Sequence, residues 1–367
     1  MKIFLVAGAR PNFMKIAPLF RIARNYSDLD CRLVHTGQHY DYEMSQTFFG
    51  DLELPSPDYF LRAGSGSHAV QTAKIMMSFE EICQKTQPDL VLLVGDVNST
   101  LACSVVAKKL LIKVAHVEAG LRSNDMRMPE EINRIVTDSL SDYFFVTEQS
   151  GLDNLIKEGK PRNRIHLVGN VMIDNLYFQL EKLKCNPPDN ALMALSEAHP
   201  RYGFLTLHRP SNVDNPDVFY ELAEALNQIS ESLPIFFPVH PRTRKMIERF
   251  DVKLSDRIHC LEPLSFGNAL FLWKDAQVVL TDSGGLQEET TALGVPCITL
   301  RENTERPITI ELGTNTLAGT QKSSILNAFN DAMHNTKPGK KTPPLWDGKA
   351  AERIWSIILS NGVKNDI

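Results

Sequence analysis

Short apolar segments alternate with amphipathic segments of helical period along almost the whole chain. This alternation is typical of βαβ units, in which helices cover the faces of a parallel sheet. In the first half of the chain, apolar runs predict strands at 2–8, 31–37, 89–96, 113–119, 143–148 and 164–170. Helical patterns predict helices between them near 11–24, 68–86, 99–110, 129–140 and 148–158. These six strands form one doubly wound sheet.

A second series of the same kind follows, with strands predicted at 203–208, 233–240, 257–263, 277–283, 296–300 and 314–319. A helix near 171–185 and a polar, proline-containing stretch separate the two series. We therefore expect an α/β protein with two Rossmann-like doubly wound domains, at 1–170 and 171–349. An amphipathic C-terminal helix at about 350–367 is expected to pack back on the first domain. The chemistry is expected in a cleft between the domains, lined by loops at the carboxyl ends of the strands.

Charge and composition narrow the class of protein. Lys and Arg number 39 against 44 Asp and Glu, a net charge of −5, and no basic block stands out, which argues against a nucleic-acid partner. The longest apolar runs are strand-length and therefore too short to span a membrane. The chain opens directly into a strand without a signal peptide, so we expect a cytoplasmic protein. Its six scattered cysteines are expected to be reduced core residues.

The loop after the first strand carries cations. Arg10 stands at the turn and Lys15 lies one helical turn further on, while the second and third glycines of a dinucleotide-binding fingerprint are missing. A nicotinamide cofactor is therefore disfavoured, and both cations are expected to face the cleft. The alternative is that they are solvated charges, although cations at a helix start oppose its positive end.

Three carboxylates follow strands or begin a helix in the first half. Asp96 ends a strand, with Asn98 or Ser99 placed to cap the next helix, and Glu118 ends the strand after it. Glu130 follows the helix-opening Pro129. Singly, each is explained by turn formation or by the helix dipole, worth about 0.3–1 kcal/mol. Together with the two cations, they supply the acids and bases that proton transfer requires.

In the second half, His208, Arg209 and His240 follow predicted strands. Each histidine is a candidate general acid or phosphate ligand, and a structural role is the alternative. The loop at 301–307 adds Arg306 at the same edge.

The segment TDSGGLQEE at 281–289 predicts an anion site where a strand passes into a helix. Ser283 or Asp282 caps the helix, and Gly284 and Gly285 expose backbone N–H groups at its positive end. Glu289, further along the helix, can accept hydrogen bonds from ribose hydroxyls, so a nucleoside diphosphate fits the segment. A plain glycine-containing N-cap is the alternative. Because no metal-binding motif is found, the protein itself must neutralise the diphosphate.

These motifs together resemble a known family, the non-hydrolysing UDP-N-acetylglucosamine 2-epimerases of bacteria and archaea. The matching segments are GARPNFMKIAP, GDVNST, HVEAGLRS, MPEEINR, LHRPSN and TDSGGLQEE, within residues 1–330. The resemblance implies a two-domain fold like that of GT-B glycosyltransferases, a homodimer and no cofactor. It also implies reversible conversion of UDP-GlcNAc to UDP-ManNAc through a 2-acetamidoglucal intermediate, for cell-surface polysaccharides. The alternatives are a 2-epimerase of a modified UDP-amino-sugar, a hydrolysing 2-epimerase, a GT-B glycosyltransferase and a non-catalytic nucleotide-sugar sensor.

The resemblance also assigns roles to residues. It places catalytic groups at Asp96, Glu118, Glu130 and His208, cationic groups at Arg10 and Lys15, and UDP contacts at Ser283, Gly284, Gly285 and Glu289. Gln38 and His39 match a pair through which a second UDP-GlcNAc activates some bacterial members. This chain departs from the pattern at Asn12, where many members have Glu, and in segment 63–71.

Overall fold

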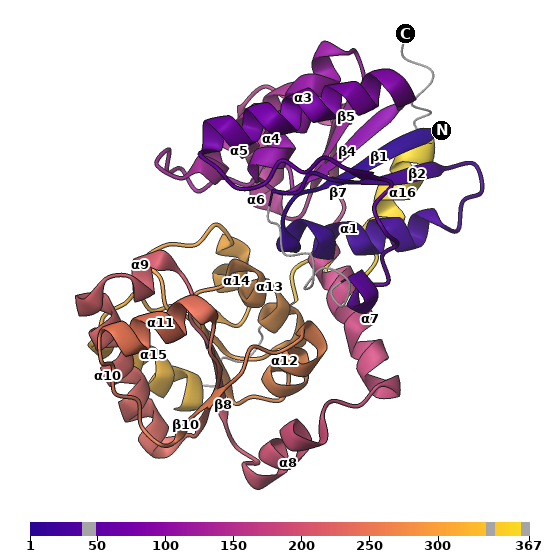
Figure 1. The fold of residues 1–367 in the computed structure, drawn as a ribbon. Helices are drawn as coiled ribbons and strands as arrows, with labels where there is room; N and C mark the ends of the chain where they lie inside the picture. The colour runs from indigo at the N-terminus through magenta and orange to yellow at the C-terminus, as the bar shows by residue number, and fades with distance from the viewer. Residues whose placement is uncertain (39–48, 335–341, 361–367) are drawn as a thin grey trace. The chain divides into compact units, whose positions relative to one another are not determined.

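The computed structural model describes residues 1–38, 49–334 and 342–360 (Figure 1). The chain divides into two compact units. Unit 1 comprises Met1–Asn175 and Pro344–Ile367, and unit 2 comprises Leu176–Pro343. The division falls inside a single helix, α7 (Val171–Cys185).

Unit 1 is built on a parallel sheet with the order β3-β2-β1-β4-β5-β6-β7. Its strands are β1 Lys2–Ala7, β2 Asp30–His35, β3 Tyr59–Phe60, β4 Leu90–Val94, β5 Lys113–Val117, β6 Tyr143–Val146 and β7 Ile165–Leu167. The register pairs Leu5 with Leu33 on one side and with Leu92 on the other. Six strands match the predicted runs. The seventh, β3, was not predicted, because a two-residue strand is too short to show an apolar pattern.

Helices cover both faces of this sheet. They are α1 Arg10–Ala23, α3 His68–Thr86, α4 Asn98–Lys109, α5 Pro129–Leu140, α6 Gln149–Lys157, the 3₁₀ turn η1 Arg162–Arg164 and α16 Ala350–Ser360. Along β1, Ile3 and Leu5 pack into the core on one face, together with residues of α1 and α16. Phe4 and Val6 pack into the core on the other face, with residues of α3 and α4. This alternation is the period of two that a strand imposes on its side chains.

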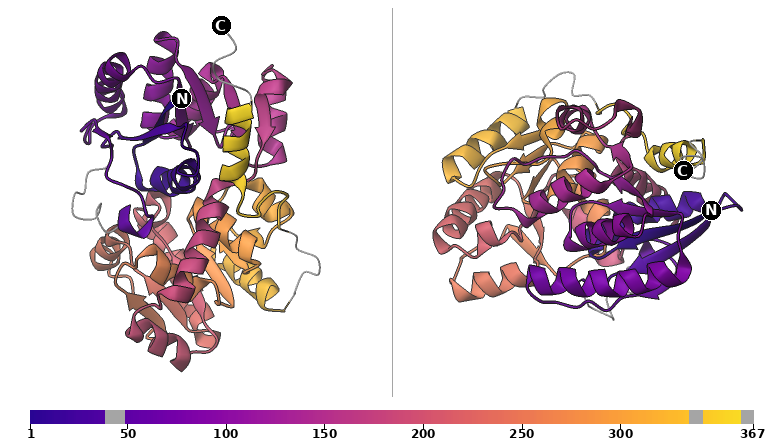
Figure 2. Two further views of the ribbon diagram at one scale, coloured as in Figure 1. Left: turned by 90° about the vertical axis from the view of Figure 1, so that its right-hand side faces the viewer. Right: turned by 90° about the horizontal axis from the view of Figure 1, so that it is seen from above.

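The C-terminal helix α16 packs against α1 (Figure 2). The buried Trp355 indole donates a hydrogen bond to the Leu19 carbonyl at 2.8 Å. The Asp174 carboxylate accepts from the backbone N–H groups of Ala350 and Ala351, at 3.0 and 2.7 Å, and so satisfies the start of α16. Burial raises the pKa of Asp174 to about 6.

Unit 2 is built on a second parallel sheet, with the order β10-β9-β8-β11-β12-β13. Its strands are β8 Gly203–Thr206, β9 Ile235–Pro238, β10 Ile258–Leu261, β11 Val278–Thr281, β12 Cys297–Thr299 and β13 Asn315–Leu317. Its helices are α8 Asn190–Ala198, α9 Pro210–Val213, α10 Pro216–Ser232, α11 Pro241–Arg249, α12 Phe266–Trp273, α13 Gly284–Leu293, α14 Pro307–Glu311 and α15 Lys322–His334. The prediction of two doubly wound α/β sheets is confirmed.

In both sheets the order in which strands are added reverses at one point, and this switch point positions the site. In unit 1 the chain leaves β1 toward β2 and β3 and returns to β4 on the other side. In unit 2 the reversal lies between β8 and β11. At such switch points the loops at the carboxyl ends of the strands diverge and leave room for a ligand.

Two further observations concern the described residues. No helix among them is long and apolar enough to cross a bilayer. The cysteines were expected in the core, but Cys185 and Cys260 are exposed, and only Cys83, Cys103 and Cys297 are buried.

Candidate active site

At the switch point of unit 1, Lys15 and Glu118 form a buried ion pair. Lys15 comes from the second turn of α1, and Glu118 directly follows β5. Gly95, directly after β4, lies against both side chains. A Cβ atom built on Gly95 would be 3.0 Å from the Lys15 ammonium and 3.4 Å from the Glu118 carboxylate. Three strand ends therefore bring a cation and a carboxylate into direct contact.

The backbone at this edge is unusual. Gly95 and Glu118 both have φ of +67°. Glycine adopts this left-handed conformation freely, whereas for Glu118 it stores strain of about 1–3 kcal/mol. Such strain is characteristic of functional sites, where surrounding contacts hold a side chain in a required direction.

Asn12 ties the start of α1 to the end of β4. Its amide oxygen accepts from the Ala9 N–H at 3.1 Å, and its amide nitrogen donates to the Val94 carbonyl at 2.9 Å. An ionised Glu at this position would supply no donor for that carbonyl. Asn12 is therefore a structural residue here, while Arg10, the first residue of α1, is exposed.

The second carboxylate, Asp96, is held by α5. It forms an ion pair with Arg134, and its backbone carbonyl accepts from Asn133 Nδ2 at 2.9 Å. About a third of the Asp96 side chain stays exposed. Asn98 and Ser99, expected to cap α4, instead lie within this helix, whose N-cap is Val97.

The two glutamates at the start of α5 differ in environment. Glu130 is exposed, whereas Glu131 is buried and accepts from the Ser123 and Asn124 N–H groups, each at 2.9 Å. Burial raises the pKa of Glu131, but these two hydrogen bonds and Arg134 outweigh it, so the net shift is downward. Glu131 is thus a fixed structural anion, and Glu130 is the carboxylate open to a ligand.

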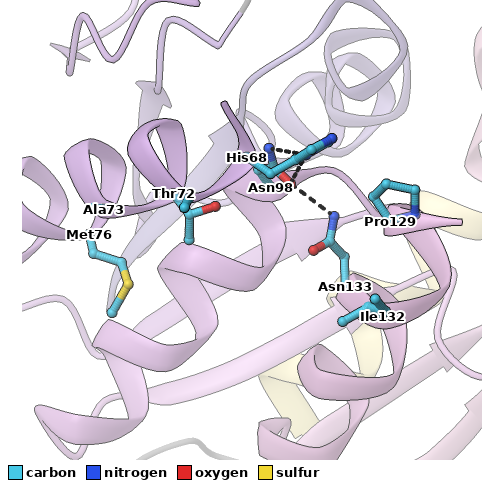
Figure 3. A pocket seen from close by; sticks show the side chains of 9 residues that line it. His68, Thr72, Ala73, Met76, Asn98, Pro129, Ile132 and Asn133 are labelled. Carbon is cyan, nitrogen blue, oxygen red and sulfur yellow. Dashed lines mark hydrogen bonds between the residues drawn. The ribbon is translucent and has the colours of Figure 1, made fainter. Parts of the chain in front are cut away.

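A pocket of about 360 Å³ lies among α3, α4 and α5 (Figure 3). Its polar end is formed by His68, Asn98 and Asn133, which are joined by hydrogen bonds (Figure 3). Most of the remaining wall is formed by Thr72, Met76, Pro129 and Ile132. Because Asn133 also contacts the Asp96 carbonyl, this pocket adjoins the Asp96 loop from the helical side.

Of the two residues matched to an activator site, only Gln38 is among the described residues, and His39 lies outside them. The Gln38 amide oxygen accepts from the Ser99 hydroxyl at 2.8 Å, and its backbone carbonyl accepts from Gln71 at 3.2 Å. Gln38 therefore ties the end of β2 to α3 and α4.

At the switch point of unit 2, Asp282 orients His208. The buried Asp282 lies directly after β11, and its Oδ1 is 2.9 Å from His208 Nδ1. Its Oδ2 accepts from the backbone N–H groups of His208 and Arg209, at 2.8 and 2.7 Å. Burial raises the pKa of Asp282, but the contacts with His208 and Arg209 outweigh it and lower the pKa overall. With Nδ1 directed at a carboxylate, the half-exposed His208 is fixed to present Nε2 elsewhere.

The start of helix α13 has no side-chain cap from its N-cap residue among the described residues. Ser283 is the N-cap, but its hydroxyl makes no capping hydrogen bond to the described residues. Asp282, the other expected cap, is directed at His208 instead. The N–H groups of Gly284 and Gly285 thus remain at the positive end of a helix, where they suit an anion.

Glu289 differs from its expected state. It is buried, and burial together with the neighbouring Glu288 raises its pKa to about 8. At neutral pH it is mostly protonated, so it donates a hydrogen bond as well as accepting one. Arg306, expected to bind the ligand, is buried with its Nε 2.7 Å from Glu288 Oε1.

Arginines and one carboxylate surround the start of α13. Glu305 pairs with Arg301 at 3.0 Å and lies 3.9 Å from Arg209. A Cβ atom on Gly284 would be 2.9 Å from Glu305 Oε1, so this carboxylate lies at the helix N-terminus. Burial opposes its ionisation, yet Arg306 and Arg301 lower the pKa of Glu305 to about 2.

The exposed His240 caps α11, accepting from the Arg242 N–H, and its ring centroid is 5.7 Å from that of His208. Burial, with a smaller contribution from the nearby His208, lowers the pKa of His240. The described residues contain no group of three His, Cys, Asp or Glu side chains suited to hold a metal ion.

Sequence reasoning missed two contacts of these networks. Arg134 holds Asp96, and Asp282 holds His208. Their partners are distant in the chain: Arg134 is 38 residues from Asp96, and Asp282 is 74 from His208. The available signal was the strand-end position of Asp282, which the sequence analysis read as a helix cap.

The two sheets, each with ionisable groups at its switch point, define a two-unit α/β protein with the features of an enzyme. Comparison with known proteins gives the family. The family model described as UDP-N-acetylglucosamine 2-epimerase matches residues 21–359. The chain therefore belongs to the UDP-N-acetylglucosamine 2-epimerase family, as the motifs predicted.

Individual relatives match this chain along most or nearly all of its length. A UDP-N-acetylglucosamine 2-epimerase of Methanocaldococcus jannaschii is 42% identical over 364 residues, covering 98% of this chain and 99% of the relative. The crystal structure of the M. jannaschii UDP-GlcNAc 2-epimerase in complex with UDP-GlcNAc and UDP matches with a TM-score of 0.87 and covers 99% and 100% of the two chains. A UDP-2,3-diacetamido-2,3-dideoxy-D-glucuronate 2-epimerase of Pseudomonas aeruginosa is 39% identical over 341 residues, or 92% and 93% of the two chains.

Proposed function

We propose that this enzyme interconverts UDP-GlcNAc and UDP-ManNAc by inverting C2 of the sugar. The observation that carries the proposal is that the two switch points present different kinds of chemical group. Unit 1 provides carboxylates paired with cations, and unit 2 provides an uncapped helix N-terminus beside an oriented histidine. The M. jannaschii structure, described as a complex with UDP-GlcNAc and UDP, supports the choice of substrate.

The chemistry explains why these groups are needed. The C2 proton is not acidic, because no carbonyl group adjoins that carbon. When the C1–O bond breaks, its electron pair leaves with UDP and positive charge develops at C1. A carboxylate then removes the C2 proton, and the C–H electrons form the C1=C2 double bond of a 2-acetamidoglucal. Protonation of C2 on the opposite face and re-addition of UDP at C1 complete the inversion.

Unit 1 supplies the proton-transfer groups in this proposal. Asp96, Glu118 and Glu130 are the candidate acids and bases, and the ion pair with Lys15 fixes the direction of Glu118. Two groups are needed because the proton leaves one face of C2 and arrives at the other.

Unit 2 supplies the leaving-group site. The N–H groups of Gly284 and Gly285 and the Ser283 hydroxyl, together with Arg209 and His208, stabilise the negative charge that UDP gains as the bond breaks. Arg10 adds a further cation from unit 1. Glu289 holds the ribose hydroxyls, and His240 lies beside His208 at the same edge.

One experiment tests the proposal against its alternatives. The enzyme is incubated with UDP-GlcNAc in deuterated water, and the sugar is followed by proton NMR. We expect UDP-ManNAc with deuterium at C2 and UDP still attached. Free ManNAc would indicate a hydrolysing 2-epimerase, and turnover only with an added acceptor would indicate a glycosyltransferase. Binding without turnover would indicate a sensor.

A second candidate is a 2-epimerase of a modified UDP-amino-sugar. It is favoured by the P. aeruginosa relative, whose name gives a diacetamido uronic acid substrate and which is 39% identical. Comparing kcat/KM for UDP-GlcNAc and for that UDP-sugar decides between them. A ratio above ten in favour of the modified sugar would overturn the first choice.

The family resemblance carries three further parts of the proposal. The enzyme acts as a homodimer, works in the cytoplasm and provides ManNAc units for cell-surface polysaccharides. Of these, dimerisation is tested directly by sedimentation.

A further inference from the structure

A buried histidine and a buried aspartate connect the two strand ends of unit 1. His116 lies in β5 and Asp138 in α5, and neither side chain is exposed at all. His116 Nδ1 is 2.7 Å from Asp138 Oδ1, and His116 Nε2 is 2.9 Å from the Gly95 carbonyl. The imidazole therefore bridges a helix and the loop after β4.

Both ring nitrogens of His116 have an oxygen partner. A carbonyl oxygen only accepts, so Nε2 donates to Gly95. Burial raises the pKa of Asp138, but His116 and Arg122 outweigh it and lower the pKa overall. The imidazole is thus held between a carboxylate and a backbone carbonyl.

The second oxygen of Asp138 holds the other loop. Asp138 Oδ2 accepts from the Gly120 N–H at 3.0 Å and lies 2.8 Å from Arg122 Nη1. Arg122 is bound in turn by both Glu158 oxygens, each at 2.8 Å. The His116–Asp138 pair thus contacts the loops after β4 and β5 together.

These loops carry the carboxylates of the proposed reaction. Gly95 directly precedes Asp96, and Gly120 lies two residues after Glu118. Gly95, Glu118 and Gly120 all have positive φ, and a Cβ on Gly120 would lie 2.2 Å from the Gly151 carbonyl. At Glu118, which is not a glycine, such a backbone persists only where neighbouring groups fix it.

We propose that His116 and Asp138 are positioning residues that hold Asp96 and Glu118 in register for proton transfer. The pair acts through the Gly95 carbonyl and the Gly120 N–H and does not touch the substrate. This inference rests on the proposed function, because the carboxylates that the pair holds are the proton-transfer groups of that function.

The test compares two substitutions of one side chain. In His116→Gln the amide nitrogen replaces Nε2 and still donates to Gly95. In His116→Asn the amide nitrogen replaces Nδ1, so the Gly95 contact is lost. Ser104→Ala is the control, because Ser104 is also fully buried in unit 1 but bonds only to Leu101 within α4.

We expect His116→Asn to lower kcat at least tenfold, with KM and UDP affinity changed less than threefold, and His116→Gln to recover much of that loss. Hydrogen exchange of peptides spanning residues 93–97 and 117–122, measured without substrate, should quicken in His116→Asn but not in Ser104→Ala. A folded His116→Asn enzyme with wild-type kcat, or with unchanged exchange, would overturn the proposal.

Asp138→Asn provides the second variant if His116→Asn does not fold. It keeps the side-chain volume but removes the carboxylate, and we expect the same loss of kcat and loop protection. If neither variant folds, the pair is a folding element and the proposal fails. If the wild type does not epimerise UDP-GlcNAc, the proposed function fails, and the exchange data alone report whether the two loops are held.

Discussion

Asp96, Glu118 and Glu130 have the same chemistry but stand in three different environments. Glu118 is buried against Lys15, Asp96 is partly exposed beside Arg134, and Glu130 is exposed. The first two carboxylates are therefore held in place by cations. The exposed Glu130 is the carboxylate whose contacts are left for a substrate.

The first prediction concerns these carboxylates. Asp96→Asn, Glu118→Gln and Glu130→Gln should each lower kcat about a hundredfold or more, because general acid–base groups contribute about 10²–10⁴-fold. UDP affinity should change little, since the proposed diphosphate site lies in unit 2. Initial rates by NMR and calorimetric titration with UDP check both parts.

Glu131→Gln is the matched control for Glu130→Gln. Because Glu131 accepts two backbone hydrogen bonds and pairs with Arg134, this change should lower the melting temperature. A threefold effect on kcat in Glu130→Gln, or a loss of folding there, would show that Glu130 is structural.

The second prediction concerns the pH dependence of stability. The pKa of Glu289 is about 8 in the folded protein against 4.5 for an ordinary Glu. The folded state therefore binds more protons between these values, so Glu289 makes stability fall as pH rises from 4.5 to 8. The free energy of unfolding of Glu289→Gln should therefore rise relative to that of the wild type across this window, by at most about 1.4 kcal/mol per pH unit.

Urea unfolding of wild type and Glu289→Gln at several pH values between 4.5 and 8 measures the difference. A difference that is constant with pH would mean that Glu289 keeps an ordinary pKa in the folded protein.

At the scale of elements, α13 shows how a helix end becomes a binding element. Its N-cap Ser283 leaves the first N–H groups without a side-chain cap from the described residues, and its C-terminus closes on Gly294 with φ of +74°. Helix ends normally satisfy such donors with their own caps. The Glu305 carboxylate lies beside this start, and the lack of a cap from Ser283 is the reason for proposing α13 as a binding element.

The third prediction tests that helix end. Gly285→Val should block backbone approach to the phosphates, and Glu289→Ala should leave the ribose hydroxyls without a partner. Each should weaken UDP binding by about 1–3 kcal/mol, the usual cost of a stranded buried polar group. Calorimetric titration with UDP measures the change, and wild-type affinity in both variants would exclude α13 from the site.

At the scale of the whole molecule, apolar side chains on α3 and α5 remain exposed. Met77 is 60% exposed, Val70 49% and Ile132 43%. Ile132 also lines the pocket among α3, α4 and α5 (Figure 3). Exposed apolar groups grouped on neighbouring helices are typical of protein interfaces, which fits the proposed homodimer.

The fourth prediction follows from this surface. Wild-type enzyme should sediment with the mass of two chains, and Met77→Glu should shift it toward one chain, because a buried unpaired charge opposes association. Ile156→Glu, at the 45% exposed Ile156 of α6, is the control and should leave the dimer intact. Dimers that are unaffected by Met77→Glu would place the interface elsewhere.

The sequence by itself determined most of the elements of this protein and the strand ends at which its candidate site residues stand. Periodicity is a local property, so the helix α3 was predicted at its observed bounds, and strand-end positions indicated Asp96, Glu118 and His208. Tertiary structure alone decided which of these side chains meet. The Lys15–Glu118 pair joins residues 103 apart, and the raised pKa of Glu289 arises from burial among neighbours that no local pattern specifies. Ionisation and pairing depend on packing across the sheet, and packing is fixed only when distant segments fold together.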